Sequence, residues 1–549
     1  MNSAKALNPN HSMQALSGRL GGGETRKPKA ENRRKAEIRN PTRAHAEAET
    51  LPCGEVSLAG RGYLPDPSPL VARPSAFGFR ASDFLRISGF GLRISTSISL
   101  LAICATLSSR AATNDVRLLT LDPGHFHAGL VQKFMYPRVS PVVHVYAPAG
   151  PDLQEHLKRI EGFNTRPDQP TRWEEQVYTG PDFLERMLRE KAGNVVVLAG
   201  NNAHKTEYIN RSVAAGFNVL ADKPMAITPA DFSLLRKAFT RAAAKKVLLY
   251  DIMTERYEIT SILQRELART PGLFGTLEKG TPEQPAVVME SVHHFFKEVA
   301  GKPLIRPAWF YDVLQQGEAV PDVGSHLADT VQWLCFPDQA LDWRKDIKVR
   351  EARRWPTRLT TEQFKRSTGL DQYPGFLKKD IGPNGALEIY ANGEVAYTLR
   401  GVHAKLTALW KFEAPPGAGD TLYALVRGTR CNLVIKQGAE QNYKPTLYVE
   451  NKSGVAPQFE QVVRAAVAKL DVTWPGLDVK PAGAAWEIII PDKYRVGHEQ
   501  HFAQVTEKFL RFLTDGNLPA LEVPNMIAKY YTTTEANRLS HIRAEVNHR

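Results

Sequence analysis

The sequence predicts an α/β protein with two folded parts, a doubly wound parallel sheet followed by an α+β domain whose sheet is mainly antiparallel. From Val116 onward, short apolar runs alternate with helical segments, and strand, helix, strand at this spacing is typical of a parallel sheet. After Glu258 the runs become longer and richer in Val, Thr, Tyr and Trp, which favours antiparallel pairing. A chain of 549 residues also exceeds the size of one core, so we expect the parallel part at 114–255 and the second domain at 256–549.

The individual elements of the parallel part follow from this alternation. Its expected strands are 116–121, 142–146, 176–178, 194–198, 218–221 and 247–250. Its expected helices are 152–160, 181–190, 205–215 and 229–244, each of which begins at a Pro, an Asp or a polar residue that can cap a helix. In the second domain the expected strands include 395–399, 404–412, 421–427 and 432–437.

The strand expected at 218–221 runs directly into Asp222, Lys223 and Pro224. The fixed φ of proline ends the strand and holds the Lys223 amine at its carboxyl end. Ligands of open parallel sheets bind at the carboxyl ends of the strands. Lys223 is therefore a candidate site residue, with an ordinary surface Lys-Pro turn as the alternative.

A Rossmann-type doubly wound sheet needs a phosphate-binding turn after its first strand. The turn at 121–129 keeps Gly124 but lacks a complete GxGxxG pattern, because Asp122 and His127 stand where the first and third glycines would be. A helix beginning near His125 would still direct free amides at a pyrophosphate. The second strand ends without an acidic residue for a ribose diol, so the pattern indicates NAD or NADP without distinguishing them.

The distribution of charge argues against a nucleic-acid partner. The net charge is +13, but the first 110 residues hold 16 Lys and Arg against 8 Asp and Glu, so the rest of the chain is nearly balanced. A balanced domain has no basic stripe to follow phosphates.

We expect residues 1–112 to be a leader outside the fold, with a signal peptide at about 93–112. The first 80 residues lack periodicity, which indicates disorder. Residues 78–95 then repeat a short unit, which suggests a start codon assigned too far upstream. A basic flank, a short apolar run and small residues then follow, which predicts export to the periplasm. The run is too short for a stable membrane span, and a lipoprotein at Cys104 is a weaker alternative because Ile103 fits poorly.

The order of four motifs resembles the glucose-fructose oxidoreductase / inositol dehydrogenase (Gfo/Idh/MocA) family over roughly residues 115–540. The motifs are the glycine turn, AGNNAHK at 199–205, AGFNVLADKP at 215–224 and DVGSHLAD at 322–329. The second half, with GVHAK at 401–405 and GAEQNYK at 438–444, is similar to exported bacterial members with their own C-terminal domain type. The resemblance implies an NAD- or NADP-dependent oxidoreductase, and we expect a homo-oligomer formed through the C-terminal sheet.

The resemblance also implies catalytic roles that fit the chemistry of alcohol oxidation. His326 would accept the hydroxyl proton, since its ordinary pKa suits a general base. Lys223 would stabilise the negative charge that develops on the same oxygen. Asp322 would orient the imidazole or bind a neighbouring hydroxyl, and its alternative role is the N-cap of a helix expected at 324–334. Asp329 is interpreted as structural.

Further candidate residues surround this centre. The expected cofactor-binding residues are Asp122, Gly124, His125, Phe126, His127, Asn201, Asn202, His204, Asp222 and Lys223. The expected substrate-binding residues are Arg256, Tyr257, His294 and Lys297. An interdomain salt bridge is the alternative for Arg256, and sheet packing is the alternative for His294 and its neighbour His293.

The histidine pairs do not predict a metal site. His293-His294, His498 with His501, and Asp322 with His326 lie in different segments, and neither Cys335 nor Cys431 belongs to a CxxC pair.

Three functions remain open from the sequence. The first is an exported dehydrogenase acting on a secondary hydroxyl of a sugar, glycoside or cyclitol. The second is a glycosidase that retains NAD and cleaves through transient oxidation. The third is a non-catalytic sugar-binding protein on a dehydrogenase fold, for which the incomplete glycine turn is the main argument.

Overall fold

The computed structural model describes residues 115–299, 302–452 and 456–547. The leader and signal peptide expected at 1–112 lie outside the described residues. In the described part no helix is long and apolar enough to cross a membrane.

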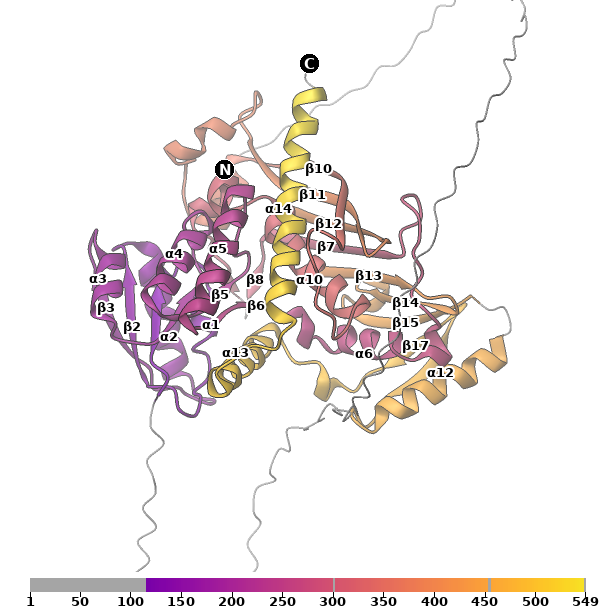
Figure 1. Cartoon of the computed structure of the whole chain (residues 1–549). Helices are drawn as coiled ribbons and strands as arrows, with labels where there is room; N and C mark the ends of the chain where they lie inside the picture. The colour runs from indigo at the N-terminus through magenta and orange to yellow at the C-terminus, as the bar shows by residue number, and fades with distance from the viewer. Residues whose placement is uncertain (1–114, 300–301, 453–455, 548–549) are drawn as a thin grey trace, which may run out of the picture. The chain divides into compact units, whose positions relative to one another are not determined.

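The first sheet is parallel throughout, with strand order β3-β2-β1-β4-β5-β6. Its strands are β1 Leu118–Leu121, β2 Val142–Ala147, β3 Glu174–Thr179, β4 Val195–Leu198, β5 Asn218–Asp222 and β6 Leu249–Ile252. Helices α2 Pro151–Thr165, α3 Phe183–Glu190, α4 Asn202–Ala215 and α5 Pro229–Lys245 connect them and flank the sheet (Figure 1). The strand order reverses at β1, so the doubly wound prediction is confirmed, and the ligand crevice of such a sheet lies at the carboxyl ends of these strands.

Local sequence accounts for the ends of these helices. Thr228 and Asp231 form a capping box at the start of α5, with Pro229 in its first turn. Asn201 caps α4 by accepting from the amide of Ala203, and Gly216 ends the helix at φ 93°.

The helix after β1 differs from the prediction. It begins at His127 and ends after one turn, as α1 His127–Leu130. A helix of one turn starts within two residues of the expected position but is short, so the turn before it would share any pyrophosphate contact with its first amides.

The second sheet has the order β10-β11-β12-β7-β13-β14-β15-β17-β16. Among the described strands β12 and β7 pair in parallel and the other neighbours pair antiparallel. The strands are β7 Val287–Phe296, β10 Ile347–Leu359, β11 Leu387–Leu399, β12 Val402–Glu413, β13 Thr421–Arg427, β14 Cys431–Lys436, β15 Thr446–Asn451, β16 Asp478–Ala482 and β17 Ala485–Ile489. This confirms the mainly antiparallel second part.

Helices surround this sheet and connect it to the first. They are α6 Ile259–Ala268, α7 Pro271–Phe274, α8 Val313–Gln316, α9 Ala319–Asp322, α10 Gly324–Cys335, α11 Thr361–Thr368, α12 Ala456–Asp471, α13 His498–Asp515 and α14 Glu522–Asn547. A small hairpin, β8 Glu298–Val299 and β9 Lys302–Pro303, and five 3₁₀ turns, 255–257, 308–311, 375–380, 439–441 and 492–494, complete the described chain.

The last two helices return to the parallel sheet. Phe502 and Phe509 of α13 and Tyr530 of α14 belong to the core of the parallel part. Ala528 and Ala536, also on α14, belong to the core of the antiparallel part. The long α14, yellow in Figure 1, therefore contributes to both cores and ties the two sheets together.

Candidate active site

Lys223 and Asp322 form a buried ion pair where the two parts meet. Lys223 follows the last residue of β5 and Asp322 is the last residue of α9, and Lys223 Nζ lies 2.7 Å from Asp322 Oδ1. Gln316 Nε2 donates to Asp322 Oδ2 at 3.1 Å. Asp322 therefore holds the lysine. The helix-cap role expected for it is wrong, because no described side chain caps α10. Its carboxylate is bound by Lys223 and Gln316 and forms no hydrogen bond with His326 among the described residues. Its expected binding of a neighbouring substrate hydroxyl stays a prediction.

His326 lies on α10, one turn beyond Asp322, and borders the same cavity as Lys223. This cavity has a volume of about 390 Å³ and is bounded by residues of both parts. The Nδ1 atom of His326 is buried and has no hydrogen-bond partner among the described residues. Nε2 is thus the ring nitrogen left for a substrate.

Burial and charge set the protonation of these groups. Burial, reinforced by the ammonium of Lys223, holds the pKa of His326 well below its ordinary value, so the imidazole is neutral. Burial would lower the pKa of Lys223, but the carboxylates of Asp322 and Asp222 outweigh it and raise that pKa. The cavity therefore holds a neutral base beside a permanent cation.

The turn after β1 brings two more histidines to the cavity. His127 Nδ1 lies 2.9 Å from Asp222 Oδ2 and His127 Nε2 lies 3.3 Å from His498 Nε2. His125 Nδ1 lies 3.6 Å from the same carboxylate oxygen. Burial lowers the pKa of His125 and holds that of His127 well below its ordinary value, so both rings are neutral.

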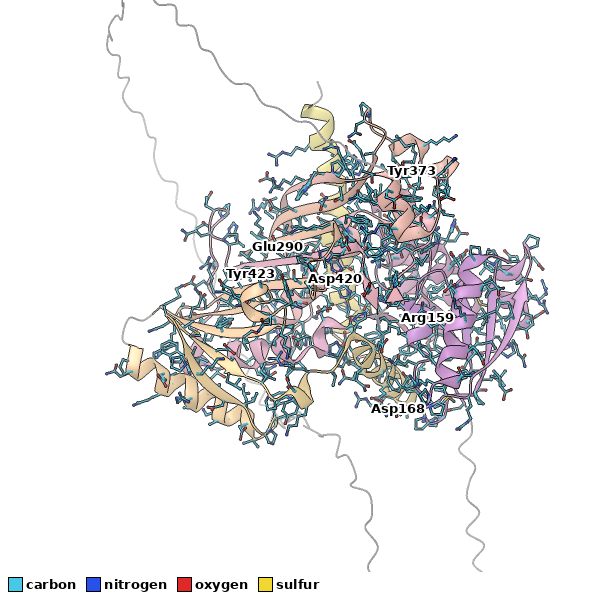
Figure 2. All side chains as sticks on the ribbon, turned by 180° about the vertical axis from the view of Figure 1, so that it is seen from behind. Arg159, Asp168, Glu290, Tyr373, Asp420 and Tyr423 are labelled. Atoms are coloured by element: carbon cyan, nitrogen blue, oxygen red, sulfur yellow. The ribbon has the colours of Figure 1, made fainter. Side chains whose placement is uncertain are left out.

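The far wall of the cavity belongs to the antiparallel part. Asp420, which precedes β13 and is labelled near the centre of Figure 2, accepts from Lys297 Nζ at 2.6 Å. His293 Nδ1 and His294 Nδ1 lie 3.1 and 3.2 Å from its carboxylate. His293 and Lys297 border the cavity, whereas His294 is buried behind it. The predicted substrate contact of His294 is thus not seen, because His294 is buried and does not border the cavity, whereas its neighbour His293 does.

Glu255 also borders the cavity, and no sequence motif points to it. It lies in the 3₁₀ turn after β6. Burial, with the negative charge of Glu258, raises its pKa to about 7, against the opposing charge of Lys223. Since nothing in its local sequence is distinctive, only its position in the fold reveals it.

We expect the raised pKa of Glu255 to be visible in stability. The pKa of this carboxyl is about 7 in the folded protein and about 4.5 in the unfolded chain. Its contribution to the free energy of unfolding is therefore complete below pH 4.5 and is lost as the pH rises through 7. Glu255→Gln should therefore be more stable than the parent above pH 7, by at most about 3 kcal/mol, and should lose that advantage below pH 4.5. Denaturant unfolding from pH 4 to 8 measures this difference. The exposed Glu283→Gln is the control, and equal pH profiles for Glu255→Gln and the parent would contradict the assignment.

A second cavity of about 600 Å³ adjoins the first over the carboxyl ends of β1 and β2. Asp122, at φ 48°, adopts the left-handed conformation that the missing glycine would have, and Tyr208 donates to its carboxylate at 3.1 Å. A Cβ on Gly124 would lie 2.9 Å from Asp152 Oδ2 and 3.1 Å from Trp309. Arg159, labelled in Figure 2, adds a guanidinium to this cavity. The side chains of Asp152 and Trp309 thus lie against the turn at Gly124, and Arg159 provides a cation that suits a dinucleotide phosphate.

Comparisons with known proteins agree with this geometry. Residues 263–541 match the family model described as "Putative oxidoreductase C terminal domain". A solved structure of a putative oxidoreductase from Parabacteroides merdae is 54% identical, with a TM-score of 0.77, and the match covers 79% of this chain and 99% of that one. The chain belongs to the Gfo/Idh/MocA oxidoreductase family.

Two other solved structures are similar to the chain at lower identity. A putative oxidoreductase from Thermotoga maritima is 14% identical, with a TM-score of 0.50, over 78% of this chain and 98% of that one. A biliverdin reductase from Synechocystis, solved with biliverdin and NADP+, is 12% identical, with a TM-score of 0.48, over 78% and 99%. No curated protein matches the chain.

Several predicted site residues of this oxidoreductase lie away from the two cavities. Arg256 binds Asp329 through two bonds of 2.6 and 2.7 Å and reaches Glu522 at 3.3 Å. It is therefore held in an ion-pair network, although both partners lie within 256–549 and the pair is not the expected interdomain one. Asp329 also binds Lys529, which supports its structural interpretation. Tyr257 packs against the core of the parallel part.

The residues expected at the start of α4 have mixed positions. Asn202 borders the first cavity and donates to the main-chain oxygen of Gln316. Asn201 caps α4 and donates to Gln315. His204 is exposed and lies against Tyr208. The segment is thus bonded to the end of α8, and of these three residues Asn202 reaches the cavity.

Proposed function

We propose that this oxidoreductase uses NAD or NADP to oxidise a secondary hydroxyl of a sugar, glycoside or cyclitol. The observation that carries the proposal is the pairing of a neutral His326 with the protonated Lys223 on one cavity, beside a second cavity suited to a dinucleotide. Polar side chains on the far wall, among them Lys297 and His293, suit a substrate with several hydroxyls.

The reaction assigns one task to each side chain. His326 takes the hydroxyl proton, since its ring is neutral. Lys223, held in place by Asp322, donates a hydrogen bond to the same oxygen as negative charge develops there. The dinucleotide, when bound, supplies the hydride acceptor. Gly124, which has no side chain, and Arg159, which offers a cation, would hold its phosphates.

We expect Gly124→Val to weaken dinucleotide binding at least tenfold, about 1.4 kcal/mol. The new side chain meets Asp152 and Trp309, which close over the turn. Calorimetry with NADH and NADPH measures the loss. Gly162→Ala, on α2 with open space around its Cβ, is the control. Unchanged affinity in Gly124→Val would show that the dinucleotide site is elsewhere.

One set of assays distinguishes the proposal from its alternatives. A steady rise of NADH with free sugars supports the dehydrogenase. Glycosidic bond cleavage without net NADH supports an NAD-retaining glycosidase. The absence of bound nucleotide at millimolar cofactor supports a sugar-binding protein and contradicts the proposal.

We further propose export and self-association. The basic, apolar and small-residue pattern at 93–112 supports export.

Self-association would use the second sheet. One face of this sheet packs against α6 and α10. Glu290 and Tyr423, cross-strand partners labelled in Figure 2, lie half-buried on the other face, which a second copy of the chain would cover. Native mass spectrometry of the protein purified from its source determines the mature N-terminus from the chain mass. The same measurement shows whether nucleotide is bound and how many chains associate. An intact leader or a monomer would contradict the corresponding proposal.

A further inference from the structure

Three side chains that can ligate a metal, His125, His127 and Asp222, meet at one edge of the active-site cavity. Their ligand atoms all lie within 4.8 Å of one another. His127 Nδ1 is 2.9 Å and His125 Nδ1 is 3.6 Å from Asp222 Oδ2. Donors bound tetrahedrally to zinc at about 2.1 Å are about 3.4 Å apart. These two separations therefore bracket the value of an occupied site.

Two atoms of this cluster are buried without a partner. His125 Nδ1 and Asp222 Oδ1 form no hydrogen bond with any described residue. A buried polar atom without a partner destabilises the folded protein, and a bound cation would relieve this. Neighbouring ammonium groups are engaged elsewhere, because Lys205 donates to the main-chain oxygen of Asp222 and Lys223 donates to Asp322. With Oδ2 of Asp222 contacted by histidine alone among the described residues, Oδ1 of its carboxylate is available to an ion.

His498 supplies an outer partner of the kind that metal-binding histidines have. Its Nε2, at the start of α13, lies 3.3 Å from Nε2 of His127. When Nδ1 of His127 faces an ion, Nε2 carries the proton and donates to His498, which fixes the ring and its tautomer.

A second His-His-Asp group lies at the far wall of the same cavity, with His294 buried behind it, and serves as an internal comparison. His293, His294 and Asp420 have similar separations, 3.1 and 3.2 Å. There the ammonium of Lys297 lies 2.6 Å from Asp420 and supplies the positive charge. The cluster around Asp222 has no such ammonium bound to its carboxylate among the described residues.

We propose that His125, His127 and Asp222 bind a divalent transition-metal ion, with zinc the best match to two imidazoles and one carboxylate. Three protein ligands leave an open coordination position, as in catalytic zinc sites. All three side chains border the cavity, so that position faces the space between Lys223 and the far wall. It would take an oxygen of solvent or of a hydroxylated or carbonyl-bearing substrate. The site does not depend on the proposed dehydrogenase reaction.

The test measures metal binding without dinucleotide or substrate. The full chain is treated with chelator, titrated with zinc by calorimetry and assayed for metal by mass spectrometry after dialysis. We expect one zinc per chain and a rise in Tm with zinc. With cobalt in place of zinc, we expect the absorption spectrum of an ion with a low coordination number. His127→Ala and Asp222→Asn should lose the stoichiometric ion, and His498→Ala should bind it about 10- to 100-fold more weakly.

His293→Ala is the matched control, since it removes a histidine of the comparison group in the same cavity. It should retain one zinc per chain. A parent protein that takes up no stoichiometric zinc would overturn the proposal, whether or not the ligand variants fold. Equal zinc affinity in the parent, His127→Ala and Asp222→Asn would also overturn it. Either result leaves the dehydrogenase proposal standing, because that proposal is tested by NADH formation.

Discussion

Lys223→Met is expected to lower kcat by about 10²- to 10³-fold, equivalent to about 2.7–4 kcal/mol of transition-state stabilisation. The ammonium matters most when the substrate oxygen bears negative charge, so the loss should appear in kcat more than in KM. Steady-state kinetics with the best sugar substrate measure it. Unchanged turnover of Lys223→Met with dinucleotide still bound would contradict a role for Lys223 in the reaction.

A matched variant separates this effect from damage to the fold. Replacing Lys223 alone leaves the Asp322 carboxylate buried without its cation, which costs about 3–5 kcal/mol for a broken buried pair. Lys223→Met with Asp322→Asn removes both charges and should recover stability. Its turnover should remain as low as that of Lys223→Met, because the donor to the substrate oxygen is still missing.

His326→Ala is expected to lower kcat by about 10²- to 10⁴-fold, the usual contribution of a general base. Activity of the parent should fall as acid protonates His326, whose pKa lies well below its ordinary value under the influence of burial and of Lys223, His498 and His293, against Asp222. The variant should lack this acid limb. A pH profile of kcat that is the same in both proteins would contradict the assignment.

The two side chains should also act as a unit. Because His326 and Lys223 serve the same oxygen, the loss in the double variant should fall well short of the product of the single losses. Fully multiplicative losses would show that the two groups act at separate steps.

The sequence by itself determined the parallel sheet and the position of Lys223. Alternating apolar runs predict strands because each run must be buried, and Pro224 ends β5 wherever the rest of the chain lies. The placement of His326 on a helix after Asp322 follows from the same local pattern. Motif order then indicates the family, whose membership the comparisons confirm.

The tertiary structure alone decided which side chains meet. Asp322 is bound by Lys223, 99 residues away, and His127 by Asp222, 95 residues away, and no local spacing reports such contacts. Whether His293 or His294 faces the cavity depends on strand register, since one step along a strand reverses the face. Glu255 and Arg159 gain their roles from the cavities around them. The propensity to form a helix or a strand depends on neighbouring residues. Charge pairing and burial depend on segments that are distant in the sequence and that only packing brings together.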